Sequence, residues 1–476
     1  MDVLDLARLQ FALTTVFHFI FVPISIGLSL LVAIMETMYV VRKNDMYKQM
    51  AKFWGKFMLI NFALGIVTGI LQEFQFGMNW SEFSRFVGDI FGAPLAIEAL
   101  LAFFLESTFI GLWLFGWDRL SRKVHLACIW LVSIGTMLSA LWILAANSFM
   151  QRPVGYAIRD GRAEMTDFAA LLTNGQLIWE FPHTVSAAIA TGAFLVAGIS
   201  AWSLLRKRHV DFFRTSFKLS VIVAFAASIA IALFGHSQAQ YLMDTQPMKM
   251  AASEGLWERS GDPAPWTVFA VIDPETRENR YEVKIPYLLS FLSYSRFSGS
   301  VPGMNELQEE YEQMYGPGNY IPPVRTTFWS FRVMVGSGVL MILLGMYGAY
   351  MALRKRWDKM PRWYLRAMIG AIFLPFIANT AGWMMTEIGR QPWTVFGLLT
   401  IEDSVSPNVT AAQVWFSLIS FSAIYLILLA VLVYLFIRTA RKGPVLEKQP
   451  EPESPEHGFD PYSANPRKGG GQVVTP

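Results

Sequence analysis

The sequence predicts an all-α polytopic membrane protein with nine transmembrane helices. Of its 476 residues, 54% are hydrophobic and 16% are Asp, Glu, Lys or Arg, whereas soluble domains carry about 25% charged residues. The apolar residues gather into runs of roughly 20 or more, long enough to cross about 30 Å of hydrocarbon. The strand alternation typical of a barrel is absent, so the runs are predicted helices. A net charge of +3 is too small to indicate a nucleic-acid partner.

The predicted spans, numbered in chain order, are the nine longest apolar stretches. They cover residues 9–40, 53–79, 92–116, 124–146, 183–205, 217–243, 328–353, 363–386 and 411–438. The first is too long for a signal peptide and lacks a small-residue cleavage site, so we expect it to be retained.

Basic residues predict the orientation of the spans. The links after spans 1, 3, 5 and 7 are rich in Lys and Arg, whereas the link after span 2 carries only Arg85 and the link after span 8 only Arg390. Basic links stay in the cytoplasm, so the N-terminus is expected outside and the C-terminus inside.

Two hydrophilic segments complete the predicted organisation. Residues 1–243 hold spans 1 to 6, residues 244–327 form a long extracytoplasmic loop, and residues 328–442 hold spans 7 to 9. The loop contains several tryptophans and prolines, which favours a functional segment over a disordered one. The tail, residues 443–476, is rich in Pro, Glu, Ser and Gly and is predicted to be disordered in the cytoplasm.

Several polar or ligand-type side chains lie at membrane depth. An ionisable residue there costs about 2.5–3.5 kcal/mol, so each is a candidate functional residue. With the orientation above, five of them fall in the outer half of the bilayer, near the long loop: His18, Glu98, His183, Met334 and Glu387. His183 is expected to open span 5 and Glu98 to lie in the first half of span 3.

A column of polar groups is predicted toward the cytoplasm. Glu106 follows Glu98 by eight residues on the same side of span 3, with Ser107 beside it and Ser139 on span 4. Such a column can pass protons, although a buried polar pair or a transporter would also use it.

The pattern favours heme over other metal groups. Cys128 is the only cysteine, and His125, His209, His236 and His457 are expected to be interfacial or exposed. Zinc or copper would need closely spaced His and Cys clusters. Single His, Met and Glu ligands on different helices suit heme.

Specific strings carry a family resemblance. They are ARLQFALTTVFHFIFVP (7–23), EFQFGMNWSEFSRFVGDIFGAPLAIE (73–98), FFLESTFIGLWLFGWDRL (103–120), FWSFRVMVG (328–336) and GWMMTEIGRQPW (382–393). Up to the tail, the chain resembles the large subunit of cytochrome bd quinol oxidase.

The resemblance implies three hemes. His183 and Met334 would be the axial ligands of a low-spin heme b, with Arg332 near its propionates. A high-spin heme b and a heme d would form the oxygen site.

For that oxygen site, the resemblance implies that His18 ligates heme d with Glu98 near its other face, and that Glu387 ligates the high-spin heme b. The two hemes can be exchanged in this assignment. Trp383 and Arg390 would line the same pocket.

The resemblance also implies a proton route, which would run through Glu106, Ser107 and Ser139.

The long loop resembles the family's quinol-binding loop, with Lys249 and Glu254 as quinol-binding residues. A carboxylate can accept a quinol proton and an ammonium can steady the resulting charge; without the resemblance, two solvated loop charges would be the simpler interpretation. The segment from Met304 to Pro323 is short, which favours the short-loop class and menaquinol over ubiquinol.

The expected function is a terminal respiratory oxidase of the bacterial cell membrane. It would oxidise quinol at the outer face and reduce O2 to water with cytoplasmic protons, separating charge without a pump. The resemblance implies a second large subunit, subunit II, and in some members a small single-span subunit. Two alternatives remain at this point: an ion-coupled transporter, which predicts inverted repeats that are not found, and a heme b electron carrier that reduces a quinone or ferric ion.

Overall fold

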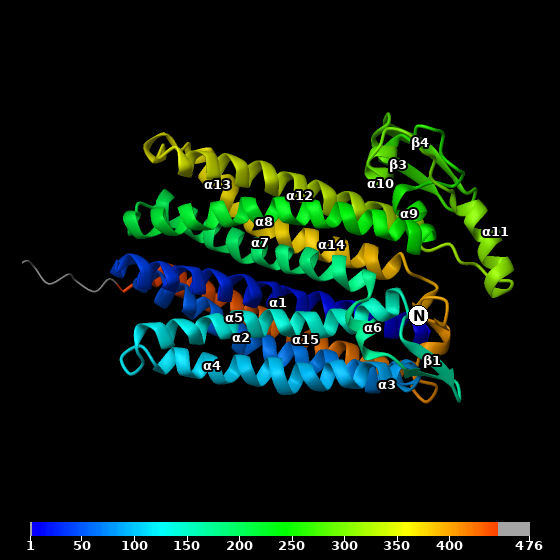
Figure 1. Ribbon diagram of the computed structural model, residues 1–476, viewed down its shortest axis with the longest axis horizontal. Coiled ribbons are helices and arrows are strands. Elements are labelled where there is room, and N and C mark those ends of the chain that lie inside the picture. Colours follow the sequence, from blue (N-terminus) through cyan, green and yellow to red (C-terminus); the bar gives the residue numbers. More distant parts are fainter. Residues whose placement is uncertain (1, 446–476) are drawn as a thin grey trace, which may run out of the picture.

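The computed structural model describes residues 2–445, and within them nine helical segments are long and apolar enough to cross a membrane. The predicted fold class is thereby confirmed for this part of the chain. The predicted disorder of the tail falls mainly on residues 446–476, which lie outside the described residues. The spans run side by side along the long axis of the molecule (Figure 1).

The spans are formed by continuous or jointed helices. They are α1 (Val3–Arg42), α2 (Asp45–Met78), α3 (Ser81–Ile97) joined to α4 (Phe104–Phe115), α5 (Arg122–Gln151), α7 (Gly175–Leu205), α8 (Val210–Thr245), α12 (Val324–Leu353), α13 (Arg362–Gly370) joined to α14 (Leu374–Ile388), and α15 (Ala411–Lys442).

Most helices extend beyond the apolar runs, which corrects two expectations. His183 does not open its span but lies about two turns inside α7, because Asn174 caps that helix by accepting a hydrogen bond from the Gln176 backbone N–H at 3.0 Å. Glu98 lies near the middle of the third span, since that span begins at Ser81. Polar residues can continue a helix outside the hydrocarbon, where hydropathy gives no signal.

Two spans contain irregular segments. The third passes through a π-helix, Glu98–Phe103, between α3 and α4. The eighth contains a 3-10 turn, Ala371–Phe373, between α13 and α14. Pro375, the second residue of α14, has no N–H to donate to the carbonyl of Ala371, which explains the break in the α-helical pattern there.

The centre of the bundle is held by close backbone contact between α1 and α7. A Cβ on Gly27 would lie 2.4 Å from the Ala188 carbonyl oxygen, and a Cβ on Gly192 would lie 2.5 Å from the Gly27 carbonyl carbon. Small residues allow this approach, as is common between membrane helices.

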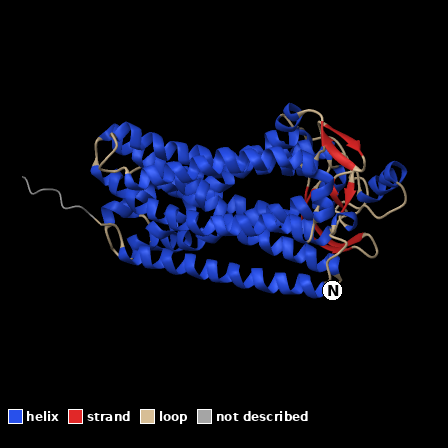
Figure 2. Cartoon of the chain, turned by 90° about the horizontal axis from the view of Figure 1, so that it is seen from below, coloured by secondary structure: helices blue, strands red, loops and turns tan. Residues whose placement is uncertain are grey.

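The long loop is folded and packs against one end of the bundle (Figures 1 and 2). It contains α9 (Pro247–Glu254), the antiparallel hairpin of β3 (Trp266–Asp273) and β4 (Glu278–Ile285), α10 (Leu288–Tyr294) and α11 (Met304–Tyr315). Short segments from other links join it at this end: β1 (Tyr156–Arg159), β2 (Arg162–Met165), α6 (Phe168–Leu172), β5 (Trp393–Val395) and β6 (Leu399–Thr400). The sequence analysis predicted none of these strands.

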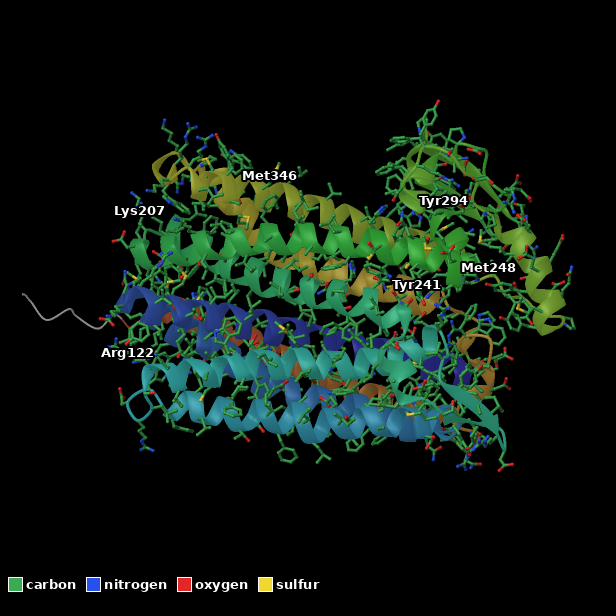
Figure 3. The ribbon with its side chains drawn as sticks, in the orientation of Figure 1. Arg122, Lys207, Tyr241, Met248, Tyr294 and Met346 are labelled. Atoms are coloured by element: carbon green, nitrogen blue, oxygen red, sulfur yellow. The ribbon has the colours of Figure 1, made fainter. Side chains whose placement is uncertain are left out.

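The N-terminus and the basic links lie at opposite ends of the bundle, as the distribution of Lys and Arg predicts. The N-terminal end of α1 lies at the loop end (Figure 1), whereas Arg122 and Lys207, from two of the basic links, lie at the opposite end (Figure 3). The folded loop and the N-terminus therefore share one side.

Candidate functional site

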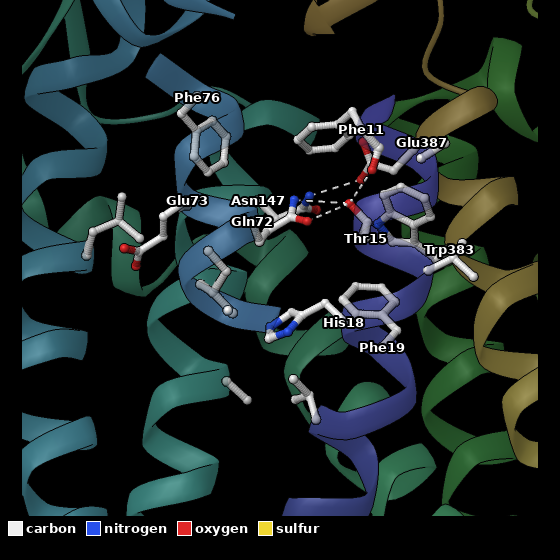
Figure 4. A pocket seen from close by; sticks show the side chains of 18 of the residues that line it. Phe11, Thr15, His18, Phe19, Gln72, Glu73, Phe76, Asn147, Trp383 and Glu387 are labelled. Carbon is white, nitrogen blue, oxygen red and sulfur yellow. Dashed lines mark hydrogen bonds between the residues drawn. The ribbon is translucent and has the colours of Figure 1, made fainter. Parts of the chain in front are cut away.

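A cavity of about 700 Å³ lies at the loop half of the bundle. It is enclosed by α1, α2, the α3–α4 span, α5 and α14 (Figure 4), and its walls are largely aromatic and aliphatic. His18, Glu98, Glu106, Ser139, Glu387 and Arg390 all line it, together with Trp383. The structure therefore brings most of the sequence-predicted site residues into one space.

His18 is presented to the cavity from α1 with one ring nitrogen already occupied. Its Nδ1 lies 2.9 Å from Thr68 Oγ1, which in turn donates to the Gly65 carbonyl at 2.7 Å. Because that hydroxyl proton is used by Gly65, Thr68 accepts from Nδ1–H. The tautomer leaves the Nε2 lone pair available as a ligand.

Glu98 and Glu106 differ in their partners. Glu98 Oε1 accepts a hydrogen bond from Ser139 at 2.5 Å, and the π-helix begins at this residue. π-helical turns in helices often mark functional sites. Glu106 is buried, and its Oε1 has no hydrogen-bond partner in the described structure. An unsatisfied buried carboxyl oxygen beside a cavity is suited to holding and releasing a proton.

Ser107 follows Glu106 in the chain but differs from it in its contacts. Its hydroxyl donates to the Phe104 carbonyl of its own helix at 3.3 Å, and it is not among the residues that line the cavity. Of the predicted polar column, Glu106, Glu98 and Ser139 line the cavity.

Glu387 is held at both carboxylate oxygens. Oε1 accepts from Asn147 at 3.0 Å and from Gln151 at 3.1 Å, and Oε2 accepts from Arg390. Arg390 also donates to the Thr394 carbonyl. Figure 4 shows Glu387 beside Asn147 at the upper rim of the cavity.

Trp383 forms part of the aromatic wall of the cavity. Its ring lies 5.6 Å from that of Phe19 and 6.4 Å from that of Phe11. The nearby side chains of Thr15 and Gln72 hydrogen bond to each other, with 3.1 Å between Gln72 Nε2 and Thr15 Oγ1 (Figure 4).

His183 and Met334 lie outside this cavity lining. His183 on α7 has its Nδ1 3.1 Å from the Ile231 carbonyl of α8, which requires Nδ1–H to donate and leaves Nε2 available. Glycines adjoin both residues: a Cβ on Gly235 would lie 2.9 Å from the His183 ring, and one on Gly382 would lie 2.7 Å from the Met334 sulfur. His183 and Met334, the expected axial ligands of the low-spin heme, therefore lie outside the cavity that His18, Glu98 and Glu387 line.

Arg332 connects α12 to the loop. Its guanidinium donates to Glu254 Oε2 at 2.7 Å, to the Ser253 carbonyl at 2.6 Å and to the Thr267 carbonyl at 2.9 Å. Glu254 is 2% exposed. The simpler interpretation of Glu254 as a solvated loop charge is therefore wrong.

Lys249 is also buried, at 2% exposed, which excludes a solvated charge here too. Its ammonium donates to Gln151 Oε1 at 2.6 Å. Burial, and then the neighbouring Arg390, lower the pKa of Lys249 to about 7, although Glu387 and Glu180 oppose this shift.

One histidine expectation is wrong. His125, expected to be interfacial or exposed, is 3% exposed. Its Nδ1 lies 2.6 Å from Glu36 Oε1 and its Nε2 lies 2.8 Å from the Trp113 carbonyl, while Trp113 Nε1 donates to Glu36 Oε2 at 2.6 Å. Glu36 lies within the predicted first span, and an ionisable residue there could have indicated that a polar partner such as His125 is buried beside it.

Other residues near the cavity were not singled out from the sequence. Glu73 lines the cavity from α2, and Asn147 and Gln151 bind Glu387 from α5. Glu73 belongs to an apolar span, so the rule that ionisable residues at membrane depth are functional candidates could have found it. The neutral amides give no comparable signal.

The residues around the cavity fit heme chemically. The space is wide and apolar, and it is approached by an imidazole nitrogen and by carboxylates that are oriented through hydrogen bonds. Oriented ligands of this kind are typical of metal sites.

Comparisons with known proteins agree along nearly the whole chain. A family model for the cytochrome bd terminal oxidase subunit I matches residues 6–444. The chain is 64% identical over 443 residues to cytochrome bd ubiquinol oxidase subunit 1 of Bacillus subtilis (strain 168), covering 93% of this chain and 94% of that protein. It is 41% identical over 509 residues to cytochrome bd-II ubiquinol oxidase subunit 1 of Escherichia coli (strain K12), covering 95% and 99%.

A solved structure shows the same fold. The bd oxidase from Geobacillus thermodenitrificans superposes with a TM-score of 0.85 at 30% identity, covering 93% of this chain and 99% of that one. From the matched family model, the relatives and the shared fold, the chain belongs to the cytochrome bd terminal oxidase subunit I family.

Proposed function

We propose that this chain is the quinol-oxidising and oxygen-reducing subunit of a bacterial terminal oxidase. The observation that carries the proposal is the meeting of His18, Glu98 and Glu387 in one apolar cavity of a family member. The nine apolar spans found within residues 2–445 make it a multi-pass protein of the cell membrane.

The assignments of His18 and His183 follow from their free Nε2 atoms, and those of Glu387 and Met334 follow from the family resemblance. His18, through Nε2, would hold heme d or the high-spin heme b, with Glu98 facing the same cavity, and Glu387 would hold the other high-spin heme. His183 and Met334 would hold the low-spin heme b. When bound, these hemes supply the electron-carrying and oxygen-binding iron; the protein supplies ligands, protons and an apolar shell.

Glu106 would hold the proton that oxygen reduction consumes. Its unpartnered Oε1 can carry that proton in a dry environment, and it lines the same cavity as Glu98. Protons would pass from Glu106 toward the Glu98 carboxylate, which Ser139 orients. Because they come from the cytoplasm while quinol protons leave outside, charge is separated without a pump.

Quinol would be oxidised at the loop. Lys249 and Glu254 lie on α9 and are buried, so the packing around α9 must open before quinol can contact them. Arg332 holds the Glu254 carboxylate in the closed arrangement. Once that ion pair loosens, Glu254 can accept the quinol proton. We favour menaquinol because the loop is short, although both relatives described above carry ubiquinol in their names.

The chain would work with subunit II, and in some assemblies with a small single-span subunit. Apolar side chains are exposed along α15, including Phe416 and Ile419, and on the third span, including Phe104 and Phe115. Lipid or a partner subunit must cover these faces.

The proposal is tested on the purified complex. A reduced-minus-oxidised optical spectrum with pyridine hemochrome extraction should reveal both b-type and d-type heme, and quinol should drive oxygen uptake. Comparing menaquinol with ubiquinol analogues decides the quinone type. A colourless protein would contradict the proposal, and b-type heme with no quinol-dependent oxygen uptake would favour the electron carrier.

A further inference from the structure

A chain of two hydrogen bonds joins Lys249 in the long loop to Glu387, the proposed ligand of a high-spin heme. Lys249 on α9 donates to Gln151 Oε1 at 2.6 Å. Gln151, the last residue of α5, donates through Nε2 to Glu387 Oε1 on α14 at 3.1 Å. One amide therefore bridges a residue proposed for quinol oxidation and one proposed to ligate iron.

Gln151 has no contact with solvent. Its exposed fraction is 0%, and Gln246 Nε2 also donates to its Oε1 at 3.2 Å and to its backbone carbonyl at 2.6 Å. The amide is locked in one orientation, because its oxygen faces two donors and its nitrogen faces a carboxylate. A flipped amide would place its N–H₂ against the Lys249 ammonium.

This hydrogen-bond chain lies within a set of four ionisable groups of balanced sign, of which three are buried and Glu387 is partly buried. Lys249 and Arg390 are the cationic members, and Glu387 and Glu180 are the acidic members. Gln176 donates to Glu180 at 3.2 Å. In a low-dielectric interior, a change of charge at one member alters the free energy of the others. Gln151 is the hydrogen-bonded connection between Lys249 and Glu387.

We propose that Gln151 is a positioning residue that couples the quinol loop to the high-spin heme ligand. Its nitrogen holds Glu387 in the ligating orientation while its oxygen holds Lys249 in the loop. The affinity of the loop for quinol and the midpoint potential of the high-spin heme that Glu387 ligates are therefore linked. This inference rests on the proposed function, because it needs both a quinol and a heme.

Variants of two neighbouring residues can test the contact to Glu387 and the contact to the loop separately. Asn147 donates to the same Glu387 oxygen at 3.0 Å, whereas Lys249 contacts Gln151 on the other side. Asn147→Leu therefore removes a hydrogen bond from Glu387 alone, Lys249→Met removes the one between the loop and Gln151, and Gln151→Met removes the bonds to both while keeping a similar length.

The experiment uses the full oxidase complex in native membranes. Two readouts are followed: the apparent KM for a quinol analogue and the midpoint potential of the high-spin hemes. We expect Gln151→Met to raise KM by about 10-fold, as loss of a hydrogen bond to a charged group predicts, and also to shift the potential. Asn147→Leu should mainly shift the potential and Lys249→Met should mainly change KM, each with the smaller change in the other readout that the coupling requires.

A double-mutant cycle tests the coupling itself. If Lys249 acts through Gln151, the KM effects of Gln151→Met and Lys249→Met are not multiplicative in the double variant. Multiplicative effects, or a Gln151→Met complex in which only one readout changes, would overturn the inference.

The unmodified complex provides a measurement that does not depend on variant folding. Linkage is reciprocal, so binding of an alkyl hydroxyquinoline N-oxide, used as a quinol analogue, should shift the high-spin heme potential. No shift despite saturated binding overturns the coupling and leaves the oxidase function intact. A complex without heme or quinol oxidation contradicts the proposed function instead.

Discussion

Single side chains in the cavity differ mainly in how many of their polar atoms are satisfied. Glu387 is bound at both oxygens, and Glu98 is bound by Ser139. Glu106 keeps one oxygen that has no hydrogen-bond partner among residues 2–445. This difference supports the proposed ligand role of Glu387, whose carboxylate is held in one orientation, and the proposed relay role of Glu106.

Glu106→Gln tests the relay role. The amide keeps the shape of the side chain but cannot release a proton, so we expect oxygen reduction to slow by about 100-fold, a typical loss for proton transfer. Reduction of the low-spin heme by quinol should remain unchanged. Stopped-flow absorbance separates the two steps.

Ser107→Ala is the matched control for that substitution. Ser107 bonds its own helix and does not line the cavity, so this variant should retain oxygen reduction. Equal slowing of both steps in Glu106→Gln would exclude a relay, and slowing in Ser107→Ala would restore that residue to the route.

Lys249 predicts a pH dependence of stability. Its pKa is about 7 in the folded protein, whereas an unfolded lysine stays protonated to about 10.4. Between these values the unfolded state binds more protons, so the free energy of unfolding rises with pH by up to about 1.4 kcal/mol per pH unit from this group. Below pH 7, Lys249 is protonated in both the folded and the unfolded state, so the full cost of burying its charge lowers the free energy of unfolding.

The measurement is the thermal unfolding midpoint of the complex in detergent between pH 6.5 and 9.5. Lys249→Met should remove the rise that the wild type shows. Lys284→Met alters an exposed lysine and should retain the rise. Identical profiles for Lys249→Met and the wild type would refute the burial argument.

Among the secondary-structure elements, spans were predictable in number but not in their irregularities. The apolar runs predicted each span, because crossing hydrocarbon requires a fixed length of apolar helix. The π-helix at Glu98 and the 3-10 turn before Pro375 left no trace in hydropathy. Helix ends were also extended beyond the predictions, since capping residues such as Asn174 act outside the apolar run.

The contact between α1 and α7 predicts a specific sensitivity. Gly27→Ala would place a Cβ 2.4 Å from a backbone oxygen, and neither helix can move without displacing its neighbours. We expect a loss of about 1–3 kcal/mol of stability, as for other overpacked cores, seen as a lower thermal midpoint.

Gly77→Ala, in helix α2, is the corresponding control. Nothing lies within 4 Å of its added Cβ, so stability should be retained or slightly raised. A Gly27→Ala protein as stable as the wild type would show that α1 and α7 can separate freely.

For the molecule as a whole, the folded loop and the basic links occupy opposite ends of the bundle (Figures 1 and 3). The positive-inside rule then predicts that the loop faces outward. A membrane-impermeant maleimide should label Glu278→Cys, in the exposed hairpin, in intact cells. Lys207→Cys, exposed at the other end, should react only after the membrane is opened.

The single native cysteine makes this labelling interpretable. Cys128 is buried and should not react. Labelling of Lys207→Cys but not of Glu278→Cys in intact cells would reverse the orientation and, with it, the direction of charge separation.

Local chemistry along the chain was enough to determine the membrane class, the number of spans and the main ionisable candidates, because the cost of exposing a backbone or a charge to hydrocarbon depends on nearby residues alone. Tertiary structure decided which candidates share a cavity, that Lys249 and Glu254 are buried, and that His125 binds Glu36. It also decided the contacts of Gln151, whose partners Lys249 and Glu387 lie 98 and 236 residues away along the chain. Such contacts depend on how the helices pack, and an uncharged amide carries no cost in the sequence pattern that would reveal them.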